Sequence, residues 1–83
     1  MPRFIAVHSE PLTEEEFKEF AKHRSQKGFS WKTSYCDFDD NKFFCDWEAP
    51  SKEALGVFLQ KVGLTFDEIY PVRLFNVAKA KFQ

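Results

Sequence analysis

The sequence predicts a single α+β domain over residues 1–83, in which two helices cover one face of an antiparallel sheet. Three observations predict this fold. Four segments carry apolar residues in the short runs or alternation of strands, two carry them at helical spacing, and the order along the chain is strand, helix, strand, strand, helix, strand. Eleven phenylalanines and 43% hydrophobic residues are enough to build one core in a chain of this length.

The first strand is expected over residues 3–8 (RFIAVH), an apolar run between two prolines. Side chains of a strand alternate between its two faces. One face therefore takes Ile5 and Val7, and the other takes Phe4, Ala6 and His8. We expect the first set to face the helices and the second set to lie on the open face of the sheet.

The first helix is predicted to begin at Thr13. Thr13 and Glu16 have the spacing of a capping box, and Leu12 can pack against Phe17 as a hydrophobic staple. Apolar positions then recur at helical spacing for about four turns. Gly28 is expected to end this helix, because glycine readily takes the left-handed conformation that follows a helix.

The second and third strands are expected over residues 29–38 and 42–49, as a hairpin that contains both cysteines. A loop of residues 40–41 would place Cys36 opposite Cys45 on one face. A loop of residues 39–41 would place the two thiols on opposite faces. We favour the second register, because it gathers the large aromatic residues on one face and gives Asn41 the positive φ that asparagine tolerates. Cys45 is then a core residue.

The second helix is expected to begin after Ser51 as N-cap and to end at Gly63. A link, LTFDEIYP, leads to a last strand over residues 72–77. With right-handed crossovers, this βαββαβ order gives a four-stranded antiparallel sheet with both helices on one face. This is the ferredoxin-like arrangement.

Charge and composition exclude several classes of protein. Twelve Lys and Arg against thirteen Asp and Glu provide little affinity for phosphate, so a nucleic-acid partner is not expected. No apolar run suits a signal peptide or a membrane span, so we expect a cytoplasmic protein without a membrane partner. Glycine-rich phosphate loops, Cys-x-x-Cys and Gly-x-Ser-x-Gly are absent from the sequence.

The open sheet face is expected to carry the candidate metal ligands, which are His8, Cys36, Asp46 and Glu48. Imidazole suits nickel, copper and zinc, and carboxylates or a thiol can complete such a site. The ordinary alternatives are a hydrogen-bonded histidine and carboxylates that keep an exposed face hydrated. Another possibility is a dimeric α+β barrel, a small enzyme or binding protein, in which two open sheets enclose an apolar pocket lined by Phe4, Phe38, Phe44 and His8, with His8 moving a proton.

The sequence also resembles a family of small ferredoxin-like proteins, mostly uncharacterised, one of which is a nickel-binding protein. The shared residues are Val7, His8, Cys45, Glu48, Ala49, Pro50, Gly63, Asp67 and Ile69. The resemblance implies a non-catalytic homodimer, formed through the open sheet face, that binds nickel or another divalent transition metal with His8 and Glu48 as main ligands. Nickel-binding members often have a histidine in the second helix, where this chain has Leu59 or Gln60.

Overall fold

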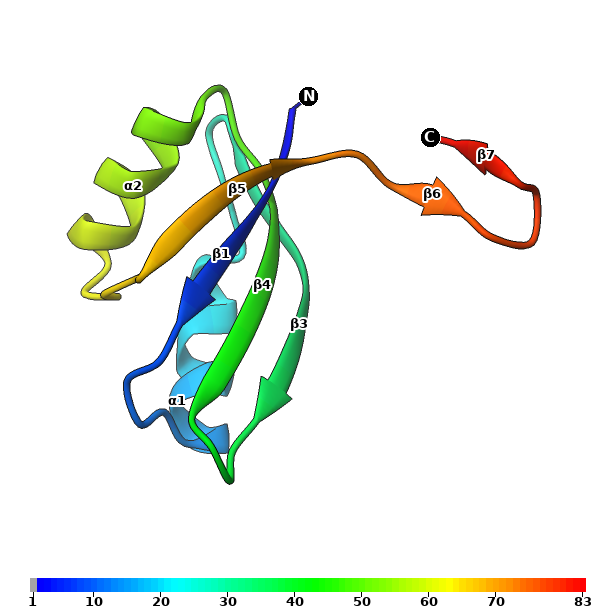
Figure 1. Cartoon of the computed structure of the whole chain (residues 1–83). Coiled ribbons are helices and arrows are strands. Elements are labelled where there is room, and N and C mark those ends of the chain that lie inside the picture. Colours follow the sequence, from blue (N-terminus) through cyan, green and yellow to red (C-terminus); the bar gives the residue numbers. More distant parts are fainter. Residues whose placement is uncertain (1) are drawn as a thin grey trace.

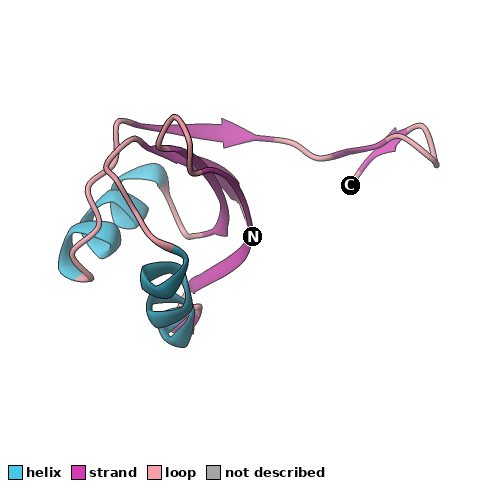
Figure 2. Cartoon of the chain, turned by 90° about the horizontal axis from the view of Figure 1, so that it is seen from below, coloured by secondary structure: helices cyan, strands magenta, loops and turns pink. Residues whose placement is uncertain are grey.

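The computed structural model describes residues 2–83 and consists of an antiparallel sheet with two α-helices on one side (Figure 1). The elements are β1 (Arg3–His8), α1 (Glu14–Phe20), the 3₁₀ turn η1 (Ala21–His23), β2 (Ser25–Gln26), β3 (Phe29–Asp37), β4 (Lys42–Glu48), α2 (Lys52–Lys61), β5 (Glu68–Val72), β6 (Phe75–Asn76) and β7 (Lys81–Phe82). The strand order of the main sheet is β2-β3-β4-β1-β5. Figure 2 shows both helices under the same face of this sheet.

The sheet has five strands, so the expectation of four is wrong. The additional strand is β2, which pairs with the start of β3. The last strand also lies earlier than expected. Residues 68–71, taken from the sequence as part of a link, form β5 together with Val72 and pair with β1, and Pro71 is accommodated because β5 is an edge strand.

The first helix begins as predicted and ends earlier. The Thr13 side chain accepts from the backbone N–H of Glu16, and the Glu16 side chain accepts from that of Thr13, which confirms the capping box. The α-helix ends at Phe20, because Ser25 and Gln26 pair with β3 instead of continuing it. Gly28 has φ 84° in the turn between β2 and β3, and therefore serves this turn and not the helix end.

The second helix agrees with the sequence. The Ser51 side chain accepts from the N–H of Ala54 at 3.0 Å, and Gly63 follows the helix with φ 84°. Leu55, Phe58 and Leu59 are buried on one side of α2. These residues pack the helix against the sheet, and Phe58 in its last turn lines the same pocket as His8 at the end of β1.

The two faces of β1 are the reverse of what we expected. Phe4, Ala6 and His8 are buried and face the helices, opposite Trp47, Cys45 and Phe43 of β4. Ile5 and Val7 lie on the open face. Because β1 is a central strand with apolar residues on both faces, the alternation alone could not decide which set is buried.

The hairpin of β3 and β4 has neither of the two registers considered. Asp37 pairs with Lys42, so the loop is residues 38–41. The Asp37 side chain accepts from the N–H groups of Asp39 and Asp40, which starts the turn one residue earlier than expected. Asn41 has φ 52°, as predicted. In this register both cysteines lie on the helix side of the sheet.

A bulge in β3 between Trp31 and Thr33 reverses which side chains face the helices near the start of the strand. Trp31 is thereby opposite Trp47 on the helix side, and the two rings stack at 5.9 Å between centroids.

None of the helices within residues 2–83 is long and apolar enough to cross a membrane.

Candidate functional site

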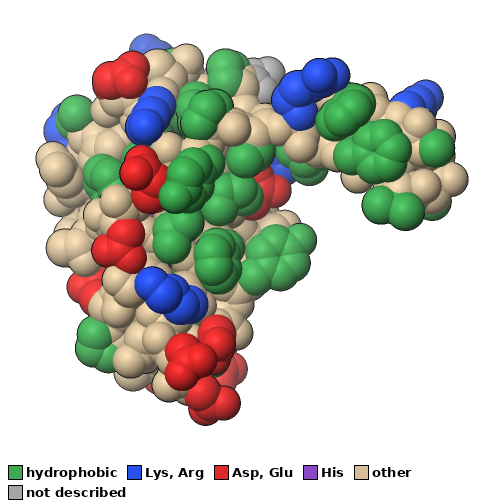
Figure 3. Space-filling model, in the orientation of Figure 1, with side chains coloured by type: hydrophobic (Ala, Val, Ile, Leu, Met, Phe, Trp, Pro, Cys, Tyr) green, Lys and Arg blue, Asp and Glu red, His purple; other side chains and the backbone are tan. Residues whose placement is uncertain are grey.

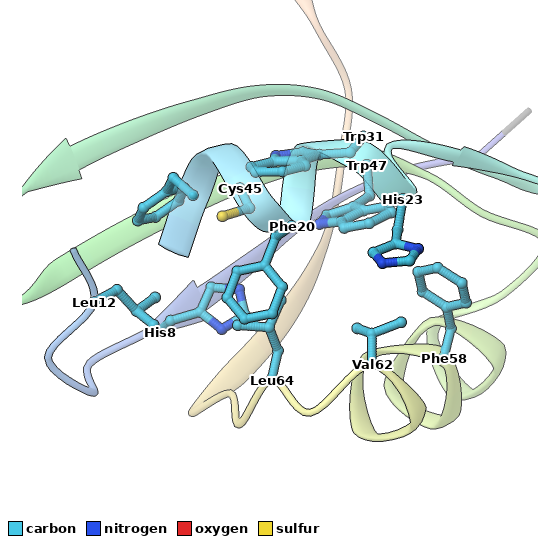
Figure 4. Close-up of a pocket in the computed structure, with 11 residues that line it drawn as sticks. His8, Leu12, Phe20, His23, Trp31, Cys45, Trp47, Phe58, Val62 and Leu64 are labelled. Atoms are coloured by element: carbon cyan, nitrogen blue, oxygen red, sulfur yellow. The ribbon is translucent and has the colours of Figure 1, made fainter. Parts of the chain in front are cut away.

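A pocket lies between the helices and the sheet, on the side opposite the open face (Figure 4). His8 of β1 and Cys45 and Trp47 of β4 line its sheet side. Phe17 and Phe20 of α1, His23 of η1, Phe58 of α2 and Val62, just after α2, line its walls. The cavity of about 20 Å³ is large enough for about one water molecule. The lining is almost entirely apolar.

His8 is the most deeply buried polar side chain described, with 1% of its surface exposed. Its Nδ1 lies 2.6 Å from the carbonyl oxygen of Thr65. A carbonyl can only accept, so Nδ1 carries the hydrogen and, in the neutral ring, Nε2 has the free lone pair. Nε2 is buried and has no hydrogen-bond partner among residues 2–83.

Trp47 presents the second unpaired nitrogen of the pocket lining. Its Nε1–H is buried and has no acceptor in the described part of the chain. Buried polar groups are nearly always hydrogen-bonded, and leaving one unpaired costs about 1–3 kcal/mol. The pocket therefore combines an acceptor, Nε2 of His8, with a donor, Nε1–H of Trp47, in apolar surroundings.

Cys45 contributes a neutral thiol to the same pocket. Burial raises the pKa of this thiol to about 11, and a hydrogen bond from Ser34, 3.0 Å from the sulfur, offsets part of that rise. The Ser34 oxygen in turn accepts from Nε1 of Trp31 at 2.8 Å. At neutral pH Cys45 is therefore protonated and adds no charge to the pocket.

The carboxylates predicted as ligands lie on the other face of the sheet. The Arg3 guanidinium donates to both carboxylate oxygens of Asp46, with Nε 3.1 Å from Oδ1. The Glu48 Oε1 atom lies 3.9 Å from Nη1 of Arg3 and 3.7 Å from Nζ of Lys32. These cations partly neutralise both carboxylates, so the open face has an ion-pair network at the place where we expected a metal site.

The four candidate ligands are consequently not brought together. His8 faces the helices, Asp46 and Glu48 face away from them, and Cys36 is exposed on β3, where partial burial raises the pKa of its thiol. Within residues 2–83 no three His, Cys, Asp or Glu side chains form a group able to hold a metal ion. The expectation of a shared face failed for two reasons: the buried set of β1, which includes His8, was assigned to the wrong side, and the hairpin register places Cys36 on the helix side.

The apolar pocket expected between two open sheets is not formed by the residues named for it. Phe4 and His8 face the helices, and Phe38 packs against Phe17 and Phe43, with centroids 6.0 and 5.4 Å apart. Only Phe44 lies on the open face. His8 does line an apolar pocket, but that pocket is on the helix side.

Sequence reasoning missed Trp47 and Thr65 as parts of the site. The signal for Trp47 was available, since a buried indole N–H needs a hydrogen-bond acceptor. No signal existed for Thr65, which contributes only its backbone carbonyl. Its role depends on the path of the loop between α2 and β5.

Comparison with known proteins gives both a fold and a family. The crystal structure of SCO4226 from Streptomyces coelicolor A3(2) matches with a TM-score of 0.75 and 21% identity, over 89% of this chain and 99% of that chain. No curated protein matches the sequence. The family model described as "Nickel responsive protein SCO4226-like" matches residues 4–72, which include β1 from Phe4 onward, both helices and β5. The chain therefore belongs to the nickel responsive SCO4226-like family.

Proposed function

We propose that this protein is a non-catalytic binding protein whose ligand enters the pocket between helices and sheet. The observation that carries the proposal is the unpaired Nε2 of His8, buried in that pocket together with the unpaired Nε1–H of Trp47. A ligand that hydrogen-bonds to these atoms removes the cost of leaving them unpaired. A water molecule in the cavity satisfies such atoms as well, but it does not use the apolar lining.

The lining favours a small, mostly apolar molecule with a hydroxyl group. A hydroxyl can donate to Nε2 of His8 or accept from Nε1 of Trp47, and the aromatic walls stabilise the apolar part of the ligand. A cavity of about 20 Å³ requires part of the wall to move outward. Within α1 and η1 every residue is exposed or only half-buried, so this segment can shift at low cost.

Nickel is a second candidate ligand, favoured by membership of a nickel responsive family. A histidine whose Nδ1–H donates to a backbone carbonyl presents Nε2 in the form that metal-binding histidines use. Cys45 and His23 line the same pocket and offer two further donors. We rank nickel second, because the described residues do not assemble a three-ligand group and the pocket is apolar.

We also propose that the protein acts as a cytoplasmic homodimer formed through the open sheet face. Tyr35 is 66% exposed there, Tyr70 is 52% exposed and Phe44 is 42% exposed, beside the half-buried Ile5 and Val7. Figure 3 shows hydrophobic side chains gathered over the sheet. A contiguous apolar surface of this kind is typical of a protein interface.

Titration of the purified protein with Ni²⁺ and, separately, with a panel of small phenols and aliphatic alcohols tests both ligands. Tryptophan fluorescence is a direct readout, because Trp31 and Trp47 line the pocket. We expect a saturable change with at least one hydroxyl compound that is lost in His8→Phe and kept in the control Asp46→Asn. The absence of any binding tighter than about 1 mM would overturn the proposal.

If nickel is the ligand, the same titration gives a different result. The wild type then binds Ni²⁺ tightly. Its affinity for Ni²⁺ falls at least tenfold in both His8→Phe and Cys45→Ala and is unchanged in Asp46→Asn. Nickel binding that depends on Asp46 and not on His8 would instead place the metal on the open face and contradict the pocket as its site.

A further inference from the structure

The C-terminal arm, residues 73–83, extends away from the rest of the molecule (Figure 1). Its strands β6 and β7 pair with each other and form a separate two-stranded sheet. Phe75 is 49% exposed, Phe82 52% and Val77 83%. An isolated hairpin is marginally stable in water, and about half of the surface of each phenylalanine of this hairpin is exposed to solvent. The arm therefore has the properties of a segment that packs on another surface.

The arm nevertheless has internal order, so it presents a defined surface. The rings of Phe75 and Phe82 pack edge to face at 5.0 Å between centroids, and the Arg73 guanidinium lies 4.2 Å above the Phe82 ring. The N–H of Gln83 donates to the carbonyl of Leu74 at 2.8 Å, which closes the hairpin. The partner of the arm would thus meet a preformed element.

Charge identifies the surface that the arm fits. The arm contains Arg73, Lys79 and Lys81 and no acidic residue. At the opposite end of the sheet, the last residue of β3 and the turn after it carry Asp37, Asp39 and Asp40, which we call the acidic turn, beside Lys42 at the start of β4. The arm follows Val72, which pairs with Arg3, and Arg3 also pairs with Glu48 at the end of β4. The acidic turn precedes Lys42 at the start of β4, where Lys42 pairs with Asp37. The two charged regions of one copy therefore lie toward opposite ends of the sheet (Figure 3).

We propose that the partner of the arm is a second copy of this chain, and that the arm of each copy lies against the acidic turn of the other. This inference rests on the proposed homodimer and specifies its geometry. When two open sheet faces meet with their strands in opposite directions, the arm end of one sheet lies over the turn end of the other. Two-fold symmetry then repeats the contact between arm and turn twice.

The same charges disfavour the other two-fold arrangement. With strands running in the same direction, both arms would lie at one end of the dimer and both acidic turns at the other. Each end would then bring like charges together, which is unfavourable at an interface. The antiparallel arrangement brings the three basic residues of each arm to three aspartates of its partner and also covers Phe75 and Phe82.

Charge reversal in the full chain, followed by sedimentation analysis of the dimer dissociation constant, tests the proposal. We expect Lys79→Glu with Lys81→Glu to weaken the dimer about tenfold or more, and Asp39→Lys with Asp40→Lys to do the same. Combining all four substitutions should restore the constant to within about threefold. Lys27→Glu with Lys61→Glu, which makes the same charge change at exposed sites outside the arm, is the matched control and should have no effect.

The outcomes separate this inference from the homodimer on which it rests. A wild-type chain that is monomeric up to about 100 µM would overturn the homodimer and the arm exchange together. A dimer whose constant is unchanged by either reversal would keep the homodimer and overturn the exchange. If both reversals weaken the dimer but the combined variant is not restored, the arm does not lie against the acidic turn, and the proposed geometry is wrong.

Discussion

His8 donates its Nδ1–H to the carbonyl oxygen of Thr65 at 2.6 Å, which joins the last residue of β1 to the loop before β5. This bond fixes the ring plane and leaves Nε2 directed into the pocket (Figure 4). The same histidine thus holds the loop to the sheet and forms the polar part of the proposed binding site. Its structural and functional roles can be separated by mutation.

Replacing His8 should destabilise the fold much more than replacing His23. His8→Ala removes a fully buried ring and the hydrogen bond to Thr65, so we expect a loss of about 2–4 kcal/mol in the free energy of unfolding. His23→Ala, at an exposed position, should change it by less than about 0.5 kcal/mol. Urea denaturation followed by circular dichroism measures both. Equal effects would mean that His8 is not buried as the structure shows.

The starts of both helices could be predicted from the sequence, because each depends on local chemistry. Thr13 and Glu16 satisfy each other's backbone N–H groups, and Ser51 caps the second helix without help from the rest of the fold. The end of the first helix could not be predicted, because it is decided by the pairing of Ser25 and Gln26 with β3. That pairing depends on tertiary structure.

The candidate site was harder to predict, because it depends on which face of each strand is buried. In β1 both faces are apolar, and the choice is made by the partner residues on β4, which bury Phe4, Ala6 and His8. In β3 the side chains that face the helices change at the bulge near Trp31, and beyond the bulge they depend on the residue at which the turn begins. The pairing of β1 with β4 therefore decided that His8 and Glu48 lie on opposite faces, and the start of the turn decided the face of Cys36.

Stability should fall between about pH 9 and pH 11 because of Cys45. Burial raises the pKa of this thiol from its ordinary value of 9.0 to about 11. In this range the unfolded chain has lost the proton that the folded protein keeps, so unfolding becomes more favourable as the pH rises. The contribution is about 2–3 kcal/mol at most. It should be absent in Cys45→Ala, measured by urea denaturation over the same pH range, and an identical pH dependence in the two proteins would contradict it.

Gly56, inside α2, and Gly63, just after the end of this helix, should respond oppositely to replacement by alanine. Gly56 lies inside the helix, and an added Cβ would lie 3.3 Å from the end of the half-buried Phe66 ring, which can shift. Gly56→Ala should therefore stabilise the protein by about 0.5 kcal/mol through helix propensity. Gly63 has φ 84°, so Gly63→Ala should destabilise it by about 1 kcal/mol. Thermal unfolding measures both, and a loss of stability in Gly56→Ala would show that Phe66 is held rigidly.

The observed register predicts that the two cysteines react independently and do not form a disulfide. Cys36 lies opposite Phe43 and Cys45 lies opposite Ser34, so the thiols share the helix-side face as diagonal neighbours. Diagonal positions are about 7 Å apart at Cβ, beyond the roughly 4 Å that a disulfide requires. Cys36 is exposed and Cys45 is buried.

With a disulfide-exchange reagent, Cys36 of the native protein should therefore react rapidly and release one equivalent of the reagent's thiolate. Cys45 should react, and release the second equivalent, only after denaturation. Cys36→Ser should lose the fast phase and keep the slow one. Mild oxidation of the wild type should leave no disulfide within a chain, as judged by the mass of proteolytic peptides. Rapid formation of a bond between Cys36 and Cys45 would place them directly opposite each other, and would require the loop of residues 40–41 in place of residues 38–41.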